Sequence, residues 1–156
     1  MAFLIEQHAD LDVRAEAERF ETASLEEILT WTWERFGSLA AIGTSYQGSG
    51  LVIIHHARKL GLDFPVFTVD TGLLFPETVA LKSRLEDFFG IQIESLTPAQ
   101  TVAEQKETYG GELWTTNPDT CCTLRKVLPL QQKLSHLDVW ITGLRRNQRD
   151  TRAETG

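Results

Sequence analysis

The sequence predicts an α/β fold built on a doubly wound parallel sheet, and two observations support this. Short apolar and β-branched runs alternate with amphipathic stretches of helical length along the 156 residues. No internal repeat or low-complexity linker interrupts the alternation. Strands that alternate with helices form a parallel sheet, and right-handed crossovers cover both of its faces. The length suits one globular domain with its own core.

A helical region is expected before the sheet. Ser24 followed three residues later by Glu27 forms a capping-box pattern, and an amphipathic stretch runs from there to about Phe36. We therefore assign residues 1–36 to an N-terminal helical region and residues 37–156 to the α/β domain.

Four strands and four helices are expected after this region. The strands are the apolar runs 39–44, 65–70, 91–96 and 138–143. The helices are 51–60, 78–89, 101–109 and 120–134, of which the first two end at Gly61 and Gly90. Residues 110–119 are expected to be irregular. We expect the four tryptophans to belong to the core: Trp31, Trp33, Trp114 and Trp140.

The loops after the first and last strands predict an anion site. In a doubly wound sheet of order 3-2-1-4, the ligand lies where these two strands end. The loop 45–50, SYQGSG, offers backbone N–H groups at a helix N-terminus. The loop 143–152, GLRRNQRDTR, offers guanidinium groups that bind oxyanions bidentately, from Arg145, Arg146, Arg149 and Arg152.

Charge is distributed unevenly along the chain. The net charge of -7 argues against a general nucleic-acid binder. Residues 1–119 carry -11, whereas residues 120–156 carry +4, which fits either a solvated basic face or the anion site. No apolar run approaches the ~20 residues of a membrane span, and the first residues do not resemble a secretory signal. We expect a cytoplasmic protein without a membrane partner.

The two cysteines of the chain are neighbours, Cys121 and Cys122. Adjacent Cα atoms lie about 3.8 Å apart, so a disulfide between them would be strained. Two alternatives remain: buried inert thiols, or thiolate ligands near a helix N-terminus beside Arg125 and Lys126. An iron–sulfur cluster usually takes four cysteines, and this chain has two.

Three stretches, VDTGLLFPET, CCTLRKVLPLQQKL and WITGLRRNQRDTR, resemble the assimilatory sulfonucleotide reductases. These are the adenylyl-sulfate and phosphoadenylyl-sulfate reductases, which have the adenine nucleotide α-hydrolase-like fold. The resemblance covers residues 35–154. It implies thioredoxin-dependent reduction of adenylyl sulfate to sulfite and AMP, through an S-sulfocysteine on a cysteine near the C-terminus of the family. This sequence lacks that cysteine, so we expect the 156-residue chain alone to be inactive.

The resemblance also implies site residues. Cys121 and Cys122 would be two ligands of a 4Fe–4S cluster whose other ligands come from a later CxxC, which is absent here. Lys126 would lie between the cluster and the phosphosulfate. The nucleotide would contact Ser45, the backbone at Val69 and Gly143, and Arg145, Arg146 and Arg152. Gln47 replaces the glycine that the family usually has in the first loop.

The tandem cysteines favour adenylyl sulfate over its 3′-phosphorylated form, because in this family they accompany the cluster. Thioredoxin is the expected electron donor, and a homo-oligomer is left open. An ATP pyrophosphatase-type adenylating enzyme is a second hypothesis. Such enzymes are expected to have the loop SGGxDS, whereas in this sequence Ser49 takes the place of the Asp. A non-catalytic nucleotide or metal sensor is a third.

Overall fold

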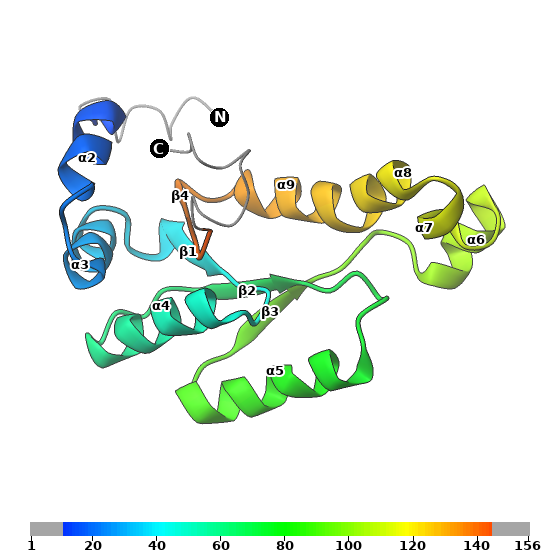
Figure 1. The fold of residues 1–156 in the computed structure, drawn as a ribbon, viewed down its shortest axis with the longest axis horizontal. Helices are drawn as coiled ribbons and strands as arrows, with labels where there is room; N and C mark the ends of the chain where they lie inside the picture. Colours follow the sequence, from blue (N-terminus) through cyan, green and yellow to red (C-terminus); the bar gives the residue numbers. More distant parts are fainter. Residues whose placement is uncertain (1–10, 145–156) are drawn as a thin grey trace.

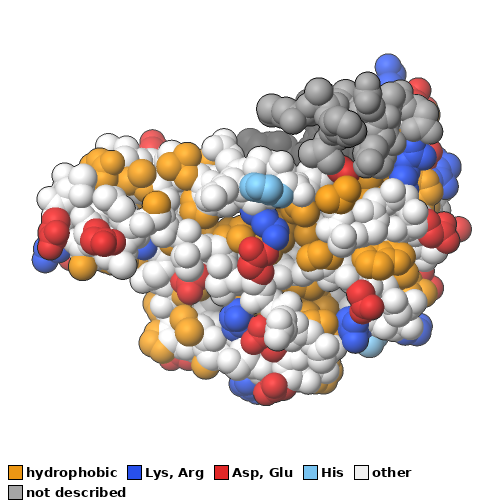
Figure 2. Space-filling model, turned by 180° about the vertical axis from the view of Figure 1, so that it is seen from behind, with side chains coloured by type: hydrophobic (Ala, Val, Ile, Leu, Met, Phe, Trp, Pro, Cys, Tyr) orange, Lys and Arg blue, Asp and Glu red, His pale blue; other side chains and the backbone are white. Residues whose placement is uncertain are grey.

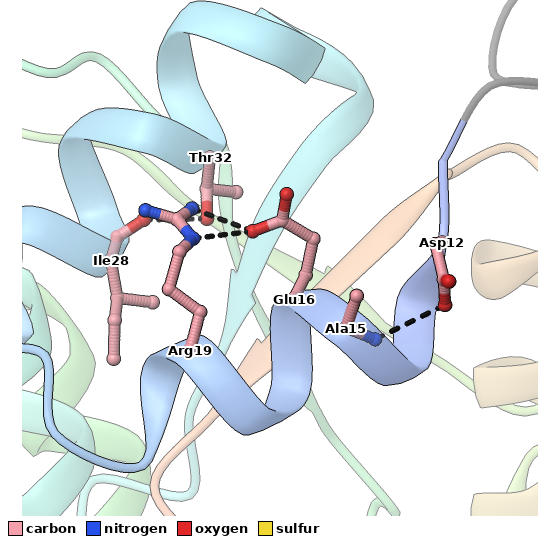
Figure 3. Close-up of polar contacts among 6 residues, drawn as sticks. All are labelled: Asp12, Ala15, Glu16, Arg19, Ile28 and Thr32. Carbon is pink, nitrogen blue, oxygen red and sulfur yellow. Dashed lines mark hydrogen bonds and ion pairs between the residues drawn. The ribbon is translucent and has the colours of Figure 1, made fainter.

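The computed structural model describes residues 11–144. The first helix of this range is α2 (Val13–Phe20), whose first turn is capped by Asp12. The Asp12 Oδ1 atom accepts hydrogen bonds from the N–H groups of Arg14 and Ala15, each at 3.1 Å. One turn further on, Arg19 Nε donates to Glu16 Oε2 at 2.7 Å (Figure 3). These contacts lie on the surface and hold a helix that has no fully buried residue.

Helix α3 (Leu25–Phe36) begins at the predicted capping box. Glu27 N–H donates to Ser24 Oγ at 3.2 Å, and Ser24 N–H donates to Glu27 Oε2 at 2.7 Å. The buried side chains Leu29 and Phe36 join the same core as the sheet, and a short 3-10 turn η1 (Gly37–Leu39) leads into the first strand. The helices expected before the sheet are therefore confirmed within the described residues.

The sheet has four parallel strands in the order β3-β2-β1-β4 (Figure 1). They are β1 (Ala40–Gly43), β2 (Val66–Val69), β3 (Ile93–Leu96) and β4 (Val139–Thr142). Gly43 lies opposite Phe67 in β2 and Thr142 in β4, while Val69 lies opposite Leu96 in β3. The carboxyl ends of all four strands thus meet at one edge, and the expected order is confirmed.

Helices cover both faces of the sheet (Figure 1). Helices α4 (Gly48–Lys59) and α5 (Pro76–Phe89) lie on one face, where Ile53, Ile54 and Ala57 of α4 pack with Ile42 and Val66. Helix α9 (Leu128–Leu134) covers the other face. There, Leu130 and Leu134 pack on Ala41, Phe67 and Leu96. Alternate strand residues point to opposite faces, which gives the doubly wound architecture its two apolar layers.

The chain between β3 and β4 departs from expectation. Helix α6 (Val102–Tyr109) was expected, but the segment predicted to be irregular contains a short helix, α7 (Leu113–Thr116). The helix predicted for 120–134 is confirmed, but it is not uniform: α8 (Pro118–Cys122) continues into a π-helical stretch, η2 (Thr123–Val127), and then into α9. Pro129 accounts for the wider turn, because it has no N–H and its ring crowds the carbonyl four residues earlier. No helix between residues 11 and 144 is long and apolar enough to cross a bilayer.

Candidate functional site

The first part of the site is the sheet edge where β1 and β4 end, the place of the crevice predicted from the sequence. The residue before α4, Gln47, makes no side-chain hydrogen bond to the first turn, so the turn's N–H groups have no capping side chain. Ser49 Oγ donates to the carbonyl oxygen of Gly143 at 2.7 Å, which ties this turn to the residue after β4. The helix N-terminus therefore lies at the predicted topological switch point, where backbone N–H groups can bind an anion.

Close backbone packing holds this crevice together. A Cβ atom on Gly143 would lie 2.6 Å from Ser49 Oγ and 2.8 Å from the backbone nitrogen of Gly50. A Cβ on Gly50 would in turn lie 2.8 Å from Thr44 Oγ1. Only glycine allows β4 and α4 to approach so closely, which explains the glycine at the end of the last strand.

The loop between β1 and α4 has a strained turn. Tyr46 adopts a left-handed conformation with φ of 63°, and its N–H donates to Thr44 Oγ1 at 3.0 Å. The Tyr46 ring packs against the core on the α4 face, and burial raises the pKa of its phenol, an effect that a hydrogen bond with Thr68 opposes. Ser45 stays exposed on the loop, beside the free N-terminus of α4.

The second part of the site is a pocket of about 330 Å³ around the cysteine pair. Cys121 is buried, with 6% of its surface exposed, whereas Cys122 is exposed. Lys126 is exposed and also lines the pocket. The opposite wall belongs to the loop after β2 and to α7, through Thr71, Leu73, Leu74 and Trp114.

A buried arginine joins the pocket to its surroundings. The side chain of Arg125 donates from Nε to the carbonyl oxygen of Thr71 at 2.5 Å. Its Nη1 atom donates to Gln105 Oε1 at 2.9 Å and to the carbonyl oxygen of Gln100 at 3.3 Å. Gln105 Nε2 in turn donates to Cys121 Sγ at 3.8 Å. These bonds tie the loop after β2, helix α6 and the cysteine helix into one unit.

The loop after β2 reaches from the strand edge to the cysteine pocket. Asp70 Oδ1 accepts from Gly72 N–H at 2.9 Å, and Thr71 Oγ1 accepts from Leu73 N–H at 3.2 Å. Two successive side-chain turns therefore shape it. Val69, the half-buried last residue of β2, comes two residues before the Thr71 carbonyl that Arg125 holds.

The predicted site residues thus fall into two groups. Ser45 and Gly143 lie at the crevice, whereas Cys121, Cys122 and Lys126 line the pocket. Arg145, Arg146 and Arg152 lie outside the described residues. Sequence reasoning missed Thr71 and Gln105, because a buried glutamine in a short polar helix gives no periodic signal, and it treated Arg125 only as a nearby charge.

Two of the tryptophans expected in the core lie at the site. Trp114 is 42% exposed and Trp140 is 40% exposed, so the expectation was wrong for both, whereas Trp31 and Trp33 do pack against the core. Trp114 lines the cysteine pocket. The indole of Trp140 lies over Gly43, where a Cβ would meet its Nε1 atom at 2.4 Å. Trp140 stays exposed because β4 is an edge strand within the described sheet.

Hydrophobic side chains also reach the surface around the α6–α8 end of the molecule (Figure 2). Tyr109, Trp114 and Leu128 are 48%, 42% and 48% exposed. The cysteine pocket therefore lies beside exposed apolar side chains.

The cysteine pair suits a soft metal or an iron–sulfur cluster as part of a larger ligand set. Thiolates are the ligands of such groups, and the exposed Cys122 faces the same pocket as the Lys126 cation. Among residues 11–144, no group of three or more His, Cys, Asp or Glu side chains could hold a metal ion. Cys121 and Cys122 thus fit two positions of a four-thiolate set.

Fold and site together define an α/β protein with a helix N-terminus at the switch point of its parallel sheet and a pocket around a thiol pair. Residues 40–156 match the phosphoadenosine phosphosulfate reductase domain family, and the chain belongs to that family.

Relatives and a solved structure agree with this assignment. The adenosine 5'-phosphosulfate reductase of Streptomyces coelicolor is 38% identical over 159 aligned residues, which cover 99% of this chain and 66% of the relative. That of Salinibacter ruber is 41% identical over 137 residues, covering 88% and 54%. The crystal structure of phosphoadenylyl-sulfate reductase from Candida auris, a phosphate complex, superposes with a TM-score of 0.73 at 26% identity, covering 84% of this chain and 66% of that one. The chain thus spans between about half and two thirds of their lengths.

Proposed function

We propose that this chain is the sulfonucleotide-binding part of a reductase that converts adenylyl sulfate to sulfite and AMP. The observation that carries the proposal is the placement of an exposed thiol and an exposed lysine in one pocket, which the loop after β2 joins to the sheet edge at the N-terminus of α4. A sulfonucleotide is a dianion with an adenosine at one end and a sulfate at the other, which matches two linked sites of this kind. Relatives named adenosine 5'-phosphosulfate reductase support it.

In this proposal the crevice binds the nucleotide. The uncapped N–H groups of α4 and the Ser45 hydroxyl donate to phosphate or ribose oxygens, and the backbone at Val69 and Gly143 contacts the adenosine. Arg145, Arg146 and Arg152 add guanidinium donors for the phosphate. Residues 37–156 would form this binding unit, and the helical region 1–36 would pack against it through α3.

The pocket would receive the sulfate end. The Lys126 ammonium offsets the negative charge that the phosphosulfate brings, and Cys121 and Cys122 are two ligands of a 4Fe–4S cluster. The cluster, when bound, supplies a polarising charge near the sulfate. The nucleophile is a further cysteine, beyond the two in this sequence. Its thiolate attacks the substrate sulfur, the S–O bond to AMP breaks, and an S-sulfocysteine forms.

Sulfite is then released by a dithiol. One thiolate of thioredoxin attacks the cysteine sulfur of the S-sulfocysteine, and sulfite leaves with the bonding electron pair, which gives a mixed disulfide. The second thiol of thioredoxin then attacks this mixed disulfide, closes the thioredoxin disulfide and releases the enzyme's cysteine thiol. We accordingly propose thioredoxin as the partner and a cytoplasmic location, where dithiol reductants are kept reduced. Neither nucleic acid nor a membrane is a partner in this scheme.

The choice of nucleotide tests the proposal. Calorimetric titration of the chain with adenylyl sulfate, its 3′-phosphorylated form and AMP should give the tightest binding for adenylyl sulfate. Tighter binding of the 3′-phosphorylated nucleotide would instead favour the second candidate function, phosphoadenylyl-sulfate reduction. The similarity to the Candida auris phosphoadenylyl-sulfate reductase supports this second candidate. Absence of binding by all three would contradict the proposal.

A further inference from the structure

The guanidinium of Arg125 is a buried cation with only neutral partners in the described structure. The residue is 3% exposed, and its hydrogen bonds go to two backbone carbonyls and one side-chain amide. No carboxylate between residues 11 and 144 forms an ion pair with it. A buried charge without a counter-ion is costly, so an anion at the adjoining pocket would offset the cost.

Arg125 also decides which way the Gln105 amide points. Arginine has only donors, so the group facing its Nη1 must be the amide oxygen of Gln105. The NH₂ group is thereby turned toward Cys121 Sγ at 3.8 Å. Gln105 is 2% exposed, so water does not compete for this donor. A fixed N–H donor facing a sulfur orients that sulfur, as hydrogen-bond partners of metal ligands generally do.

The two neighbouring cysteines consequently differ. Cys121 is buried and receives the Gln105 hydrogen bond, whereas Cys122 is exposed and has no hydrogen-bond partner within the described region. One thiol is held by the protein, and the other faces the pocket with Lys126.

We propose that Gln105 is a positioning residue for the cysteine pair. Its amide holds the Cys121 sulfur in place as a ligand. Arg125 fixes the amide and also binds the Thr71 carbonyl of the loop after β2. The same guanidinium thus couples the ligand sulfur to the loop that leads to the nucleotide crevice. The inference rests on the proposed function, because it concerns the same thiol pair.

Nuclear magnetic resonance of the ¹⁵N-labelled chain tests the contact directly, without any cluster. The side-chain amide signals of Gln105, assigned by their loss in Gln105→Leu, should exchange with water on the order of tenfold more slowly than those of the exposed Gln132. Cys121→Ala should shift these signals, whereas Cys122→Ala should leave them in place. Rapid exchange, or equal shifts in both cysteine variants, would overturn the proposal.

The reduction potential tests the role of the contact when the cluster is present. In a cluster-loaded protein that also carries the other two cysteine ligands, Gln105→Leu should have a more negative midpoint potential, because a hydrogen bond to a ligand sulfur stabilises the reduced state. Gln105→Glu keeps an oxygen for Arg125 but replaces the donor with a carboxylate, and its potential should fall further. Gln100→Ala is the matched control, since Gln100 contacts Arg125 only through its backbone carbonyl.

These two measurements separate the inference from the proposed function. An unchanged potential in both Gln105 variants would overturn the positioning role. Failure of a protein with all four cysteine ligands to accept a cluster would count against the proposed function, whereas the magnetic resonance result on this chain would still decide whether Gln105 holds Cys121.

Discussion

The proposed nucleotide crevice, at the sheet edge where β1 and β4 end, and the cysteine pocket are built in opposite ways. The crevice is made largely of backbone, because Gly143 and Gly50 let β4 and α4 approach within a distance that no Cβ would permit. The pocket is made of side chains from short, irregular helices and a loop, joined by Arg125. Substitutions that add atoms should therefore destabilise the site made of backbone. Substitutions that remove side-chain atoms should destabilise the site made of side chains.

The largest effect on stability is expected from Arg125→Ala. The substitution leaves the carbonyl of Thr71 and the amide oxygen of Gln105 without their donor in a buried position. Unsatisfied buried acceptors cost about 1–3 kcal/mol each, so the free energy of unfolding should fall by about 3–5 kcal/mol. Urea denaturation followed by circular dichroism measures this. A loss below ~1 kcal/mol would show that the pocket does not depend on the arginine.

Gly143→Ala is the corresponding test of the crevice. The new Cβ would meet Ser49 Oγ and the Gly50 nitrogen, and forcing such atoms apart costs about 1–3 kcal/mol. Ser49→Ala removes the hydroxyl, but the contact with the Gly50 backbone remains, so the double variant should recover only part of the loss. Thermal unfolding of Gly143→Ala, Ser49→Ala and the double variant measures these changes in stability. Full recovery would mean that the Gly50 backbone can move away from the added Cβ, and it would contradict the expectation that this backbone site is sensitive to added atoms.

Lys126→Ala and Arg152→Ala should weaken nucleotide binding with little change in stability. Each removes a hydrogen bond to a charged group, worth about 1.5–3 kcal/mol, so the Kd for adenylyl sulfate should rise roughly 10- to 150-fold. The control is Lys59→Ala at the far end of α4, where the lysine pairs with Glu26. Unchanged affinity in both test variants would place the ligand elsewhere.

The smallest effect is expected outside both sites, at the capping box of α3. Hydrogen bonds from the Ser24 backbone and hydroxyl hold the pKa of Glu27 below its ordinary value of 4.5. A lowered folded-state pKa stabilises the fold above the unfolded pKa, and this stability is lost as the pH falls through the folded value. Acid unfolding of Glu27→Gln should therefore depend less on pH below about 4.5 than that of the unmodified chain. An identical pH dependence would contradict it.

Much of the fold followed from the sequence alone. The alternation of apolar runs and amphipathic stretches predicted the strands, and Ser24 and Glu27 marked the start of α3, because such signals act over a few residues of local backbone. The strand order, used as a hypothesis, put Ser45 and Gly143 at one edge, where the structure has the Ser49–Gly143 bond. The motif that contains Cys121, Cys122 and Lys126 could also be recognised in the sequence.

Only the tertiary structure decided how the pocket is closed. Thr71, Gln105 and Arg125 are far apart in sequence, and their contacts depend on how α6 and the π-helical stretch pack, which no local period encodes. The exposure of Trp114 and Trp140 was decided in the same way, since burial depends on which elements lie alongside and hydrophobicity alone does not determine it. The sequence determines local backbone preferences and apolar faces. Which polar side chains meet depends on how those faces pack together, because the partners are far apart in sequence.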